Sequence, residues 1–480
     1  MERNEALISR IDAYLREARP QIVADIKNLV RIPSKKGPPA ENAMFGLDNR
    51  RAMDTVTELW LARGMKDARV FGEGHYATAM SPGSGRCIGF FNHVDVVPEG
   101  TNWDHDPFDP VETAEYIIGR GAADNKNGIV ASLYAAKAVR DLSLPVRSSI
   151  LLFAGGDEET GMTDIAAFAA EQPQPDFSFV VDSMFPVCNG EKGYMTAEAV
   201  CQVPFSTVIS LKGEAGNTVS ARVADRAWAQ LPADAQVLQR LRDAEARGEC
   251  KVVVKEDGLI EASAEGISKH SSEPEGSINA IGVLAGVLAK CPELGESDCK
   301  ILRTVADALS DPTGKPLGVD FSDSMSGKSY CICRSGETVD GKLKLVFNPR
   351  YCVSVTGDMV LQKLDEFFAP KGWSVQAVSK SDGYYIPKDD PRIVQLSQIY
   401  REVTGREDCE PQIIGGGTYA RHLKNAVGFG PTYPDPLPEG HGTAHNPNET
   451  LVIDLLLEAI KMYILSIMTI DEILQQGLDR

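Results

Sequence analysis

Three short apolar runs, each followed directly by acidic residues, constrain the fold of this chain more than any other feature. Residues 87–91, 149–153 and 177–181 have the length and apolarity of buried strands, and helical patterns at 126–140 and 164–171 separate them. Strands that alternate with helices indicate an α/β sheet with parallel strands. Because the carboxyl ends of parallel strands form the binding crevice of such sheets, we expect the acidic residues to cluster there.

The side chains that follow these runs are of the types that bind metals. They are His93 and Asp95 after the first run, Glu158 and Glu159 after the second, Asp182 after the third, and Asp124 at the start of the helix at 126–140. A single histidine is common in a structural position, and a pair of adjacent glutamates is common in a solvated loop. Here, however, acidic residues follow an apolar run three times, and this repetition favours a metal site. Carboxylates crowded into a pocket need cations, since burying them unpaired is very costly. One histidine among several carboxylates suits zinc, and manganese or cobalt less strongly.

The pattern of predicted strands and helices changes twice along the sequence, which indicates an inserted domain. From about residue 194, short strands such as 197–203 and 251–255 mix with helices such as 278–288. After about residue 381 the α/β pattern returns, and Asp390-Pro391 and Gly405 are typical of the start and end of a helix. We therefore predict an α/β fold in two domains. A discontinuous catalytic domain (1–194 and 381–480) has a mixed central sheet flanked by helices, and an α+β domain (195–380) is inserted into it.

Composition limits the classes of partner and the compartment. The 68 acidic and 49 basic residues give a net charge of −19, which would repel nucleic acid. The apolar segment 451–470 contains Asp454, Glu458 and Lys461, so we expect a core helix and no membrane span. Ten cysteines without a disulfide-like spacing, and an N-terminal region without the apolar core of a secretory signal, favour free thiols in a cytoplasmic protein.

Longer motifs surround the candidate ligands and continue to the C-terminal part of the chain. They are NHVDVVP at 92–98, GRGAADNK at 119–126, GDEETG at 156–161, VDSMFP at 181–186, GEKG at 190–193, GGGTYAR at 415–421 and AHNPNE at 444–449. Together, and in this order, they resemble the motifs of the di-zinc hydrolase family of carnosinases, aminoacylases and bacterial dipeptidases. Within that family the chain is most similar to the bacterial dipeptidases that act on short peptides.

The resemblance implies a role for each candidate residue. Five ligands would hold two divalent metal ions: Asp124 between the ions, His93 and Asp182 on one of them, and Glu159 and His445 on the other. Glu158 would be the general base, and Asp95 would orient His93, as metal-bound imidazoles commonly require. His441, four residues before His445, is the rival ligand, and the family motif favours His445.

The inserted domain would supply the contacts to the substrate. The resemblance implies that His270 hydrogen-bonds the developing oxyanion, that Arg350 binds the free carboxylate of the substrate, and that Asn217 is a further contact. A planar guanidinium suits bidentate binding of a carboxylate. In this family the peptide bond that corresponds to Asp124-Asn125 is often cis.

These observations lead to one preferred function and two alternatives. We expect a zinc-dependent dipeptidase that hydrolyses the amide bond of short peptides with a free C-terminal carboxylate. We expect it to work as a monomer, with the insert as a lid that brings His270 to the site of its own chain. An N-acyl-amino-acid amidohydrolase would use the same metals and base, and would differ in lacking recognition of a free amino group. A metal-binding relative without catalysis is disfavoured because Glu158 is retained beside the full ligand set.

Overall fold

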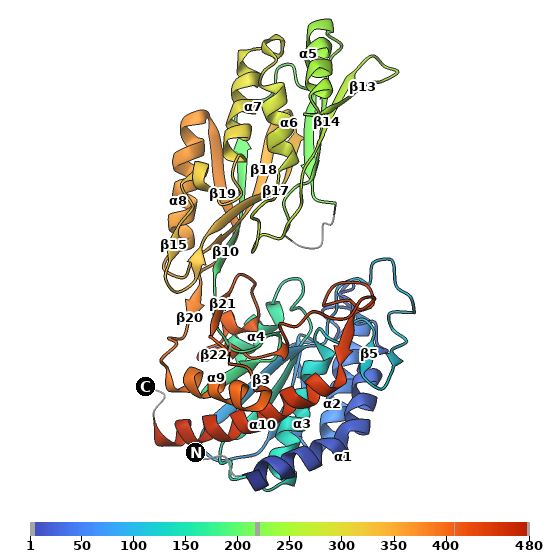
Figure 1. Cartoon of the computed structure of the whole chain (residues 1–480), viewed down its shortest axis with the longest axis vertical. Helices are drawn as coiled ribbons and strands as arrows, with labels where there is room; N and C mark the ends of the chain where they lie inside the picture. The colour runs from blue at the N-terminus through green and yellow to red at the C-terminus, as the bar shows by residue number, and fades with distance from the viewer. Residues whose placement is uncertain (1–4, 217–220, 408, 478–480) are drawn as a thin grey trace. The chain divides into compact units, whose positions relative to one another are not determined.

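The computed structural model describes residues 5–216, 221–407 and 409–477, which belong to two compact units (Figure 1). The first unit comprises the chain up to Gly190, Ile386–Gln412 and the chain from Gly417 onward. The second comprises Glu191–Tyr385 and Ile413–Gly416. The fold class predicted from the sequence is confirmed, because a mixed α/β unit is interrupted by a second unit that contains both helices and strands.

The first unit is built on a mixed sheet whose strands run in the order β1-β2-β6-β3-β7-β22-β9. These strands are β1 (Lys66–Phe71), β2 (Tyr76–Ser81), β3 (Cys87–His93), β6 (Ser149–Gly155), β7 (Phe177–Val180), β9 (Cys188–Glu191) and β22 (Ala426–Gly428). Strands β6, β3, β7 and β22 are mutually parallel, whereas β1, β2 and β9 pair antiparallel with their neighbours. The apolar runs predicted as strands are β3, β6 and β7, and each is almost completely buried, as parallel strands covered on both faces should be.

Helices cover this sheet. They are α1 (Glu5–Val30), α2 (Leu47–Ala62), α3 (Lys126–Asp141), α4 (Thr163–Glu171), α9 (Pro391–Thr404) and α10 (Ile453–Gln476), with a 3-10 turn at Tyr419–His422. Helices α1, α3 and α10 lie side by side and share the main hydrophobic core (Figure 1). Helix α9 begins and ends as predicted: the Asp390 side chain accepts the N–H of Arg392, and Gly405 has a φ of 69°.

Helix α10 contains most of the apolar segment that the sequence assigns to the core. Most of its apolar residues are buried, while Lys461 forms an ion pair of 2.8 Å with Asp12 on α1. Within 5–216, 221–407 and 409–477, every helix falls short of the length or the apolarity that spanning a membrane requires. Each of the ten cysteines is a free thiol.

The second unit is an antiparallel sheet with helices packed on it. Its strands run in the order β13-β14-β12-β11-β17-β18-β10-β19. They are β10 (Gly193–Cys201), β11 (Ser210–Glu214), β12 (Arg226–Leu231), β13 (Lys251–Val254), β14 (Ile260–Glu265), β17 (Tyr330–Val339), β18 (Lys342–Tyr351) and β19 (Trp373–Ser381). The helices are α5 (Ala235–Ala246), α6 (Ala280–Leu288), α7 (Glu296–Ala308) and α8 (Gly357–Phe368). Burial alternates strictly along β10, which is typical of a sheet with one face packed on helices.

Shorter strands complete the two units. They are β4 (Val111–Glu112), β5 (Tyr116–Ile118), β8 (Ser183–Met184), β15 (Ser322–Asp323), β16 (Gly327–Lys328), β20 (Tyr384–Tyr385), β21 (Gln412–Ile414), β23 (Pro431–Thr432) and β24 (Thr450–Val452). Strand β24 pairs with β5, and β5 with β4, in a small sheet. This small sheet holds the C-terminal end of the loop that carries His445.

Candidate metal centre

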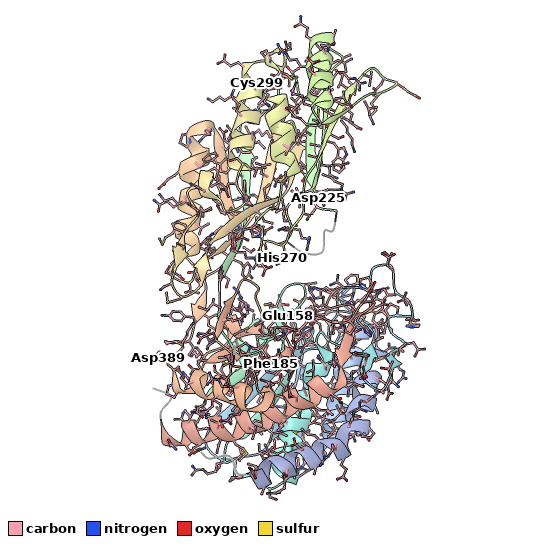
Figure 2. All side chains as sticks on the ribbon, viewed as in Figure 1. Glu158, Phe185, Asp225, His270, Cys299 and Asp389 are labelled. Carbon is pink, nitrogen blue, oxygen red and sulfur yellow. The ribbon has the colours of Figure 1, made fainter. Side chains whose placement is uncertain are left out.

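The register of the parallel strands brings the predicted ligands to one edge of the first unit. His93 is the last residue of β3 and pairs with Gly155, the last residue of β6, so the loop after β6 leaves the sheet beside His93. Strand β7 ends at Val180, so Asp182 follows at the same edge. Glu158, labelled in Figure 2, lies in the loop between β6 and α4. The clustering that the sequence predicts from strand ends therefore occurs.

Asp124 reaches this edge from the start of α3. The side chain of the next residue, Asn125, ties the helix to two strands: its Nδ2 donates to the carbonyl of Val181 at 2.5 Å, and its Oδ1 accepts the N–H of His93 at 3.3 Å. The peptide bond between Asp124 and Asn125 is cis. The two hydrogen bonds of the Asn125 side chain hold the first turn of α3 against the ends of β3 and β7.

The carboxylate of Asp124 lies between two sets of side chains. Its Oδ1 is 3.0 Å from Nε2 of His93, and the same Nε2 is 3.5 Å from Oδ2 of Asp182. Its Oδ2 is 3.0 Å from Nε2 of His445, which in turn is 3.0 Å from Oε1 of Glu159. The five residues that the resemblance assigns as ligands thus form two groups that share Asp124.

The rival histidine occupies a different environment. His441 places its Nδ1 3.0 Å from the hydroxyl of Thr450 and packs its ring against Tyr116, with ring centroids 4.5 Å apart. His445 alone of the two contacts Asp124 and Glu159. The geometry therefore favours His445 as the ligand.

The two adjacent glutamates face different partners. Glu159 contacts His445, whereas a carboxylate oxygen of Glu158 lies with His93 and Asp182 in a group whose ligand atoms are all within 4.8 Å of one another. A second such group consists of His93, Asp124 and Glu159. Glu158 therefore lies on the His93–Asp182 side of the cluster, close enough to act on a molecule bound there.

The concentration of charge perturbs the ionisation of the cluster. Burial, and next the charge of Asp182, raise the pKa of Glu158 well above its ordinary value. Burial and the charge of Asp124 raise the pKa of Glu159 to about 7. Burial by itself lowers the pKa of His445, but its contacts with Asp124 and Glu159 outweigh this effect and raise the pKa to about 11. All three shifts favour the protonated forms, which lowers the negative charge of the cluster.

The donor set fits divalent cations. Ligands about 2.0–2.2 Å from a zinc ion in a tetrahedral site are about 3.3–3.6 Å apart. The contacts of 3.0–3.5 Å among the five candidate ligands come close to this spacing. Imidazole and carboxylate groups are ordinary ligands of zinc, and cations would replace the protons that the cluster otherwise retains. The residues present therefore fit two ions that share Asp124.

A buried network that the sequence does not predict supports the Glu158–Glu159 turn. The Asp95 carboxylate accepts the backbone N–H groups of Glu158 at 3.2 Å and Glu159 at 3.0 Å. The contact at 2.9 Å from His93 Nδ1 is with the main-chain oxygen of Asp95, and the Asp95 carboxylate is 3.4 Å away. Asp95 thus contacts His93 and also fixes the turn.

Two further buried aspartates extend this network. Asp157 accepts Lys36 Nζ at 2.6 Å and the hydroxyl of Thr163 at 2.5 Å. Asp164 accepts the N–H of Asp157 at 2.8 Å and the hydroxyl of Tyr419. A Cβ at Gly155 would lie 2.0 Å from that hydroxyl, which explains the glycine there. The only signal of this network in the sequence is the proximity of these residues to the family motifs.

The second unit holds the residues that the resemblance assigns to the substrate. His270 places its Nδ1 2.7 Å from the Ser272 hydroxyl, and Nε of Arg350 donates to the Ser271 hydroxyl at 3.2 Å. The Arg350 guanidinium also lies over the ring of Tyr194, 5.3 Å from its centroid. His270 and Arg350 thus lie in one neighbourhood of this unit. Asn217 lies outside the described residues.

Comparison with known proteins points to a family of peptidases. The profile of Peptidase family M20/M25/M40 matches residues 89–469. "Putative dipeptidase YtjP" of Bacillus subtilis is 28% identical over 464 residues, which cover 93% of this chain and 96% of that protein. "Putative dipeptidase SSP1012" of Staphylococcus saprophyticus is 28% identical over 472 residues, which cover 94% and 97%.

Solved structures share the fold at low sequence identity. Human carnosine dipeptidase 1 has a TM-score of 0.58 and 16% identity, covering 97% of this chain and 99% of its own. The dipeptidase Dug1p of Saccharomyces cerevisiae has a TM-score of 0.59 and 13% identity, covering 97% and 98%. Since the family profile matches most of the sequence, the chain belongs to the M20/M25/M40 family of peptidases and is a peptide-bond hydrolase.

Proposed function

We propose that this peptidase is a two-metal dipeptidase that prefers zinc and cleaves short peptides with a free C-terminal carboxylate. The observation that carries the proposal is the position of Asp124, with one oxygen toward His93 and the other toward His445. When bound to these residues, two divalent cations would supply the Lewis acidity that activates a water molecule and polarises a scissile carbonyl. Manganese and cobalt accept the same donor set.

Glu158 is the proposed general base. Asp95 fixes the backbone of Glu158 and Glu159, whose side chains face different partners. Glu159 faces His445 as a ligand, which leaves Glu158 to accept a proton from the attacking water and pass it to the leaving amine. Burial and the charge of Asp182 raise the pKa of Glu158, which is the direction that a glutamate exchanging protons near neutral pH requires.

His270 and Arg350 are the proposed substrate contacts. Ser272 donates its backbone N–H to Nδ1 of His270 at 3.3 Å, which places the ring proton on Nε2, where it can stabilise charge on the carbonyl oxygen. Arg350 donates its Nε to the Ser271 hydroxyl, and a planar guanidinium suits bidentate binding of a carboxylate. Asn217 is retained as a proposed contact. We propose further that the second unit acts as a lid on the site of its own chain and that a monomer is active.

The dipeptide class is supported by the names of the curated relatives and by the proposed carboxylate clamp. A substrate panel with metal-reconstituted enzyme tests it: a dipeptide, its N-acetylated form, its C-terminal amide and a tetrapeptide. The proposal predicts the highest kcat/KM for the free dipeptide. A preference for the N-acetylated substrate would instead identify an N-acyl-amino-acid amidohydrolase.

A further inference from the structure

Glu449 is a buried carboxylate whose hydrogen bonds converge on the segment that ends at Asp124. Its Oε1 accepts three backbone N–H groups, from Gly121 at 3.1 Å, Ala123 at 2.8 Å and Asp124 at 3.0 Å. Its Oε2 accepts Nη1 of Arg120, and the two side chains are 0% and 1% exposed. The backbone oxygen of Glu449 also accepts the N–H of Gly119 at 2.9 Å. Glu449 thus holds the segment 119–124 in place through hydrogen bonds with five of its six residues.

The same residue lies where the loop that carries His445 closes. The N–H of Gly442 donates to the carbonyl of Asn448 at 2.8 Å, and the N–H of Thr450 donates to the carbonyl of Gly442 at 2.9 Å. His445 lies within this closed loop, and Glu449 is at its end. Glu449 therefore connects the loop that supplies His445 directly to the segment that supplies Asp124. The side chains of His445 and Asp124 are 3.0 Å apart.

This arrangement exceeds what neutralising a buried arginine requires. An ion pair with Arg120 alone would need one oxygen, yet the other oxygen gathers three main-chain donors that end at Asp124 itself. A carboxylate that accepts several N–H groups orients the backbone that bears them. The direction in which the Asp124 side chain leaves the backbone is thereby tied to the loop of His445.

We infer that Glu449 is a positioning residue of the metal centre, which sets Asp124 relative to His445 and so holds the shared ligand in place. This inference rests on the two-metal function proposed above. Residues that orient metal ligands typically change metal affinity about 10–100-fold when they are replaced. Glu449 is thus proposed to act through Asp124 and His445, and not to bind the ions or the substrate itself.

Glu449→Gln is the informative variant, because glutamine has the same size but only one acceptor oxygen. Whichever way the amide is turned, its NH₂ faces either Arg120 or the three backbone N–H groups, so one side of the clamp is lost. Asp471→Asn is the matched control. Asp471 is also buried and accepts the N–H of Ser148 at 2.7 Å, but at the amino end of β6, opposite the metal ligands.

The experiment is a titration of the chelated full chain with cobalt, monitored by visible absorption and by competition with a chelator, with thermal unfolding of the metal-free proteins alongside. We expect Glu449→Gln to weaken the affinity for one or both ions about 10–100-fold and to change the cobalt spectrum. Asp471→Asn should lower the metal-free melting temperature but keep wild-type affinity and spectrum.

The outcomes separate this inference from the function on which it rests. Wild-type protein that binds fewer than two cobalt ions would overturn both. Wild-type protein with two ions, and a Glu449→Gln variant of equal affinity and spectrum, would overturn the positioning role alone, as would equal losses in Asp471→Asn. If Glu449→Gln does not fold, Glu449→Asp takes its place. It keeps the charge but is too short to reach both Arg120 and the backbone donors, so the same loss of affinity is expected, and wild-type binding would reject the inference.

Discussion

Replacing Glu158 by glutamine separates proton transfer from metal binding. The turn that carries Glu158 is fixed through backbone N–H groups on Asp95, so the variant should leave the turn in place. Glutamine matches the size of glutamate but cannot take up the proton of the attacking water. General-base catalysis contributes about 10²–10⁴ in rate, so we expect kcat to fall by that factor, which corresponds to about 2.7–5.4 kcal/mol in the activation free energy.

Glu159→Gln is the matched control, because it changes the next residue in the same way. Glu159 contacts His445 at 3.0 Å, and its side chain is only 9% exposed. Because Glu159 is a proposed ligand, the Glu159→Gln change should weaken the affinity for one metal ion. The loss should exceed the factor of about 10–100 that is typical of residues that only orient ligands. The assay is kcat on a dipeptide at saturating metal, together with metal content per chain by elemental analysis.

The results have distinct meanings. The assignment of Glu158 as base and Glu159 as ligand predicts two results. Glu158→Gln should bind two ions but lose turnover, and Glu159→Gln should lose an ion. Wild-type turnover in Glu158→Gln would reject its role as base. Loss of an ion from Glu158→Gln would make Glu158 a ligand, a role that its place near His93 and Asp182 also allows, and would refute the separation of roles drawn here.

Three further predictions concern metal dependence, substrate recognition and the source of His270. Chelation should abolish turnover and zinc, manganese or cobalt should restore it; full activity in verified metal-free protein would contradict the two-metal proposal. Arg350→Lys should lower kcat/KM for free-acid dipeptides about tenfold or more, since the fork of hydrogen bonds to a charged group is lost, while residual activity on C-terminal amides should change little; equal losses on both would exclude the clamp. A mixture of His270→Ala and Glu158→Ala proteins, allowed to exchange subunits, should stay inactive, and recovered activity would show that histidine is supplied by a partner chain.

The sheet and its ligand-bearing edge could be predicted because the signals are local. The apolar runs of β3, β6 and β7 are continuous, and the ligands follow them within a few residues. The start and end of α9 could be predicted for the same reason, since Asp390 and Gly405 act on their own neighbours.

The supporting contacts could not be predicted because they join distant parts of the sequence. Tyr419 meets Asp164 across 255 positions, and Glu449 meets Arg120 across 329. Nothing in the local pattern distinguishes these acids from solvated ones, and only the folded chain shows that they are buried. The role of Asp95 is a similar case, since its bonds to the backbone of the Glu158–Glu159 turn appear only when β3 and β6 are paired.

The number and position of bound ions test the central claim most directly. Crystals of the zinc-loaded protein, measured at the zinc absorption edge, would locate each ion by anomalous scattering. The account predicts two ions per chain, one against His93 and Asp182 and the other against Glu159 and His445, with one oxygen of Asp124 on each. A single ion at saturating zinc, or two ions of which neither touches Asp124, would contradict it.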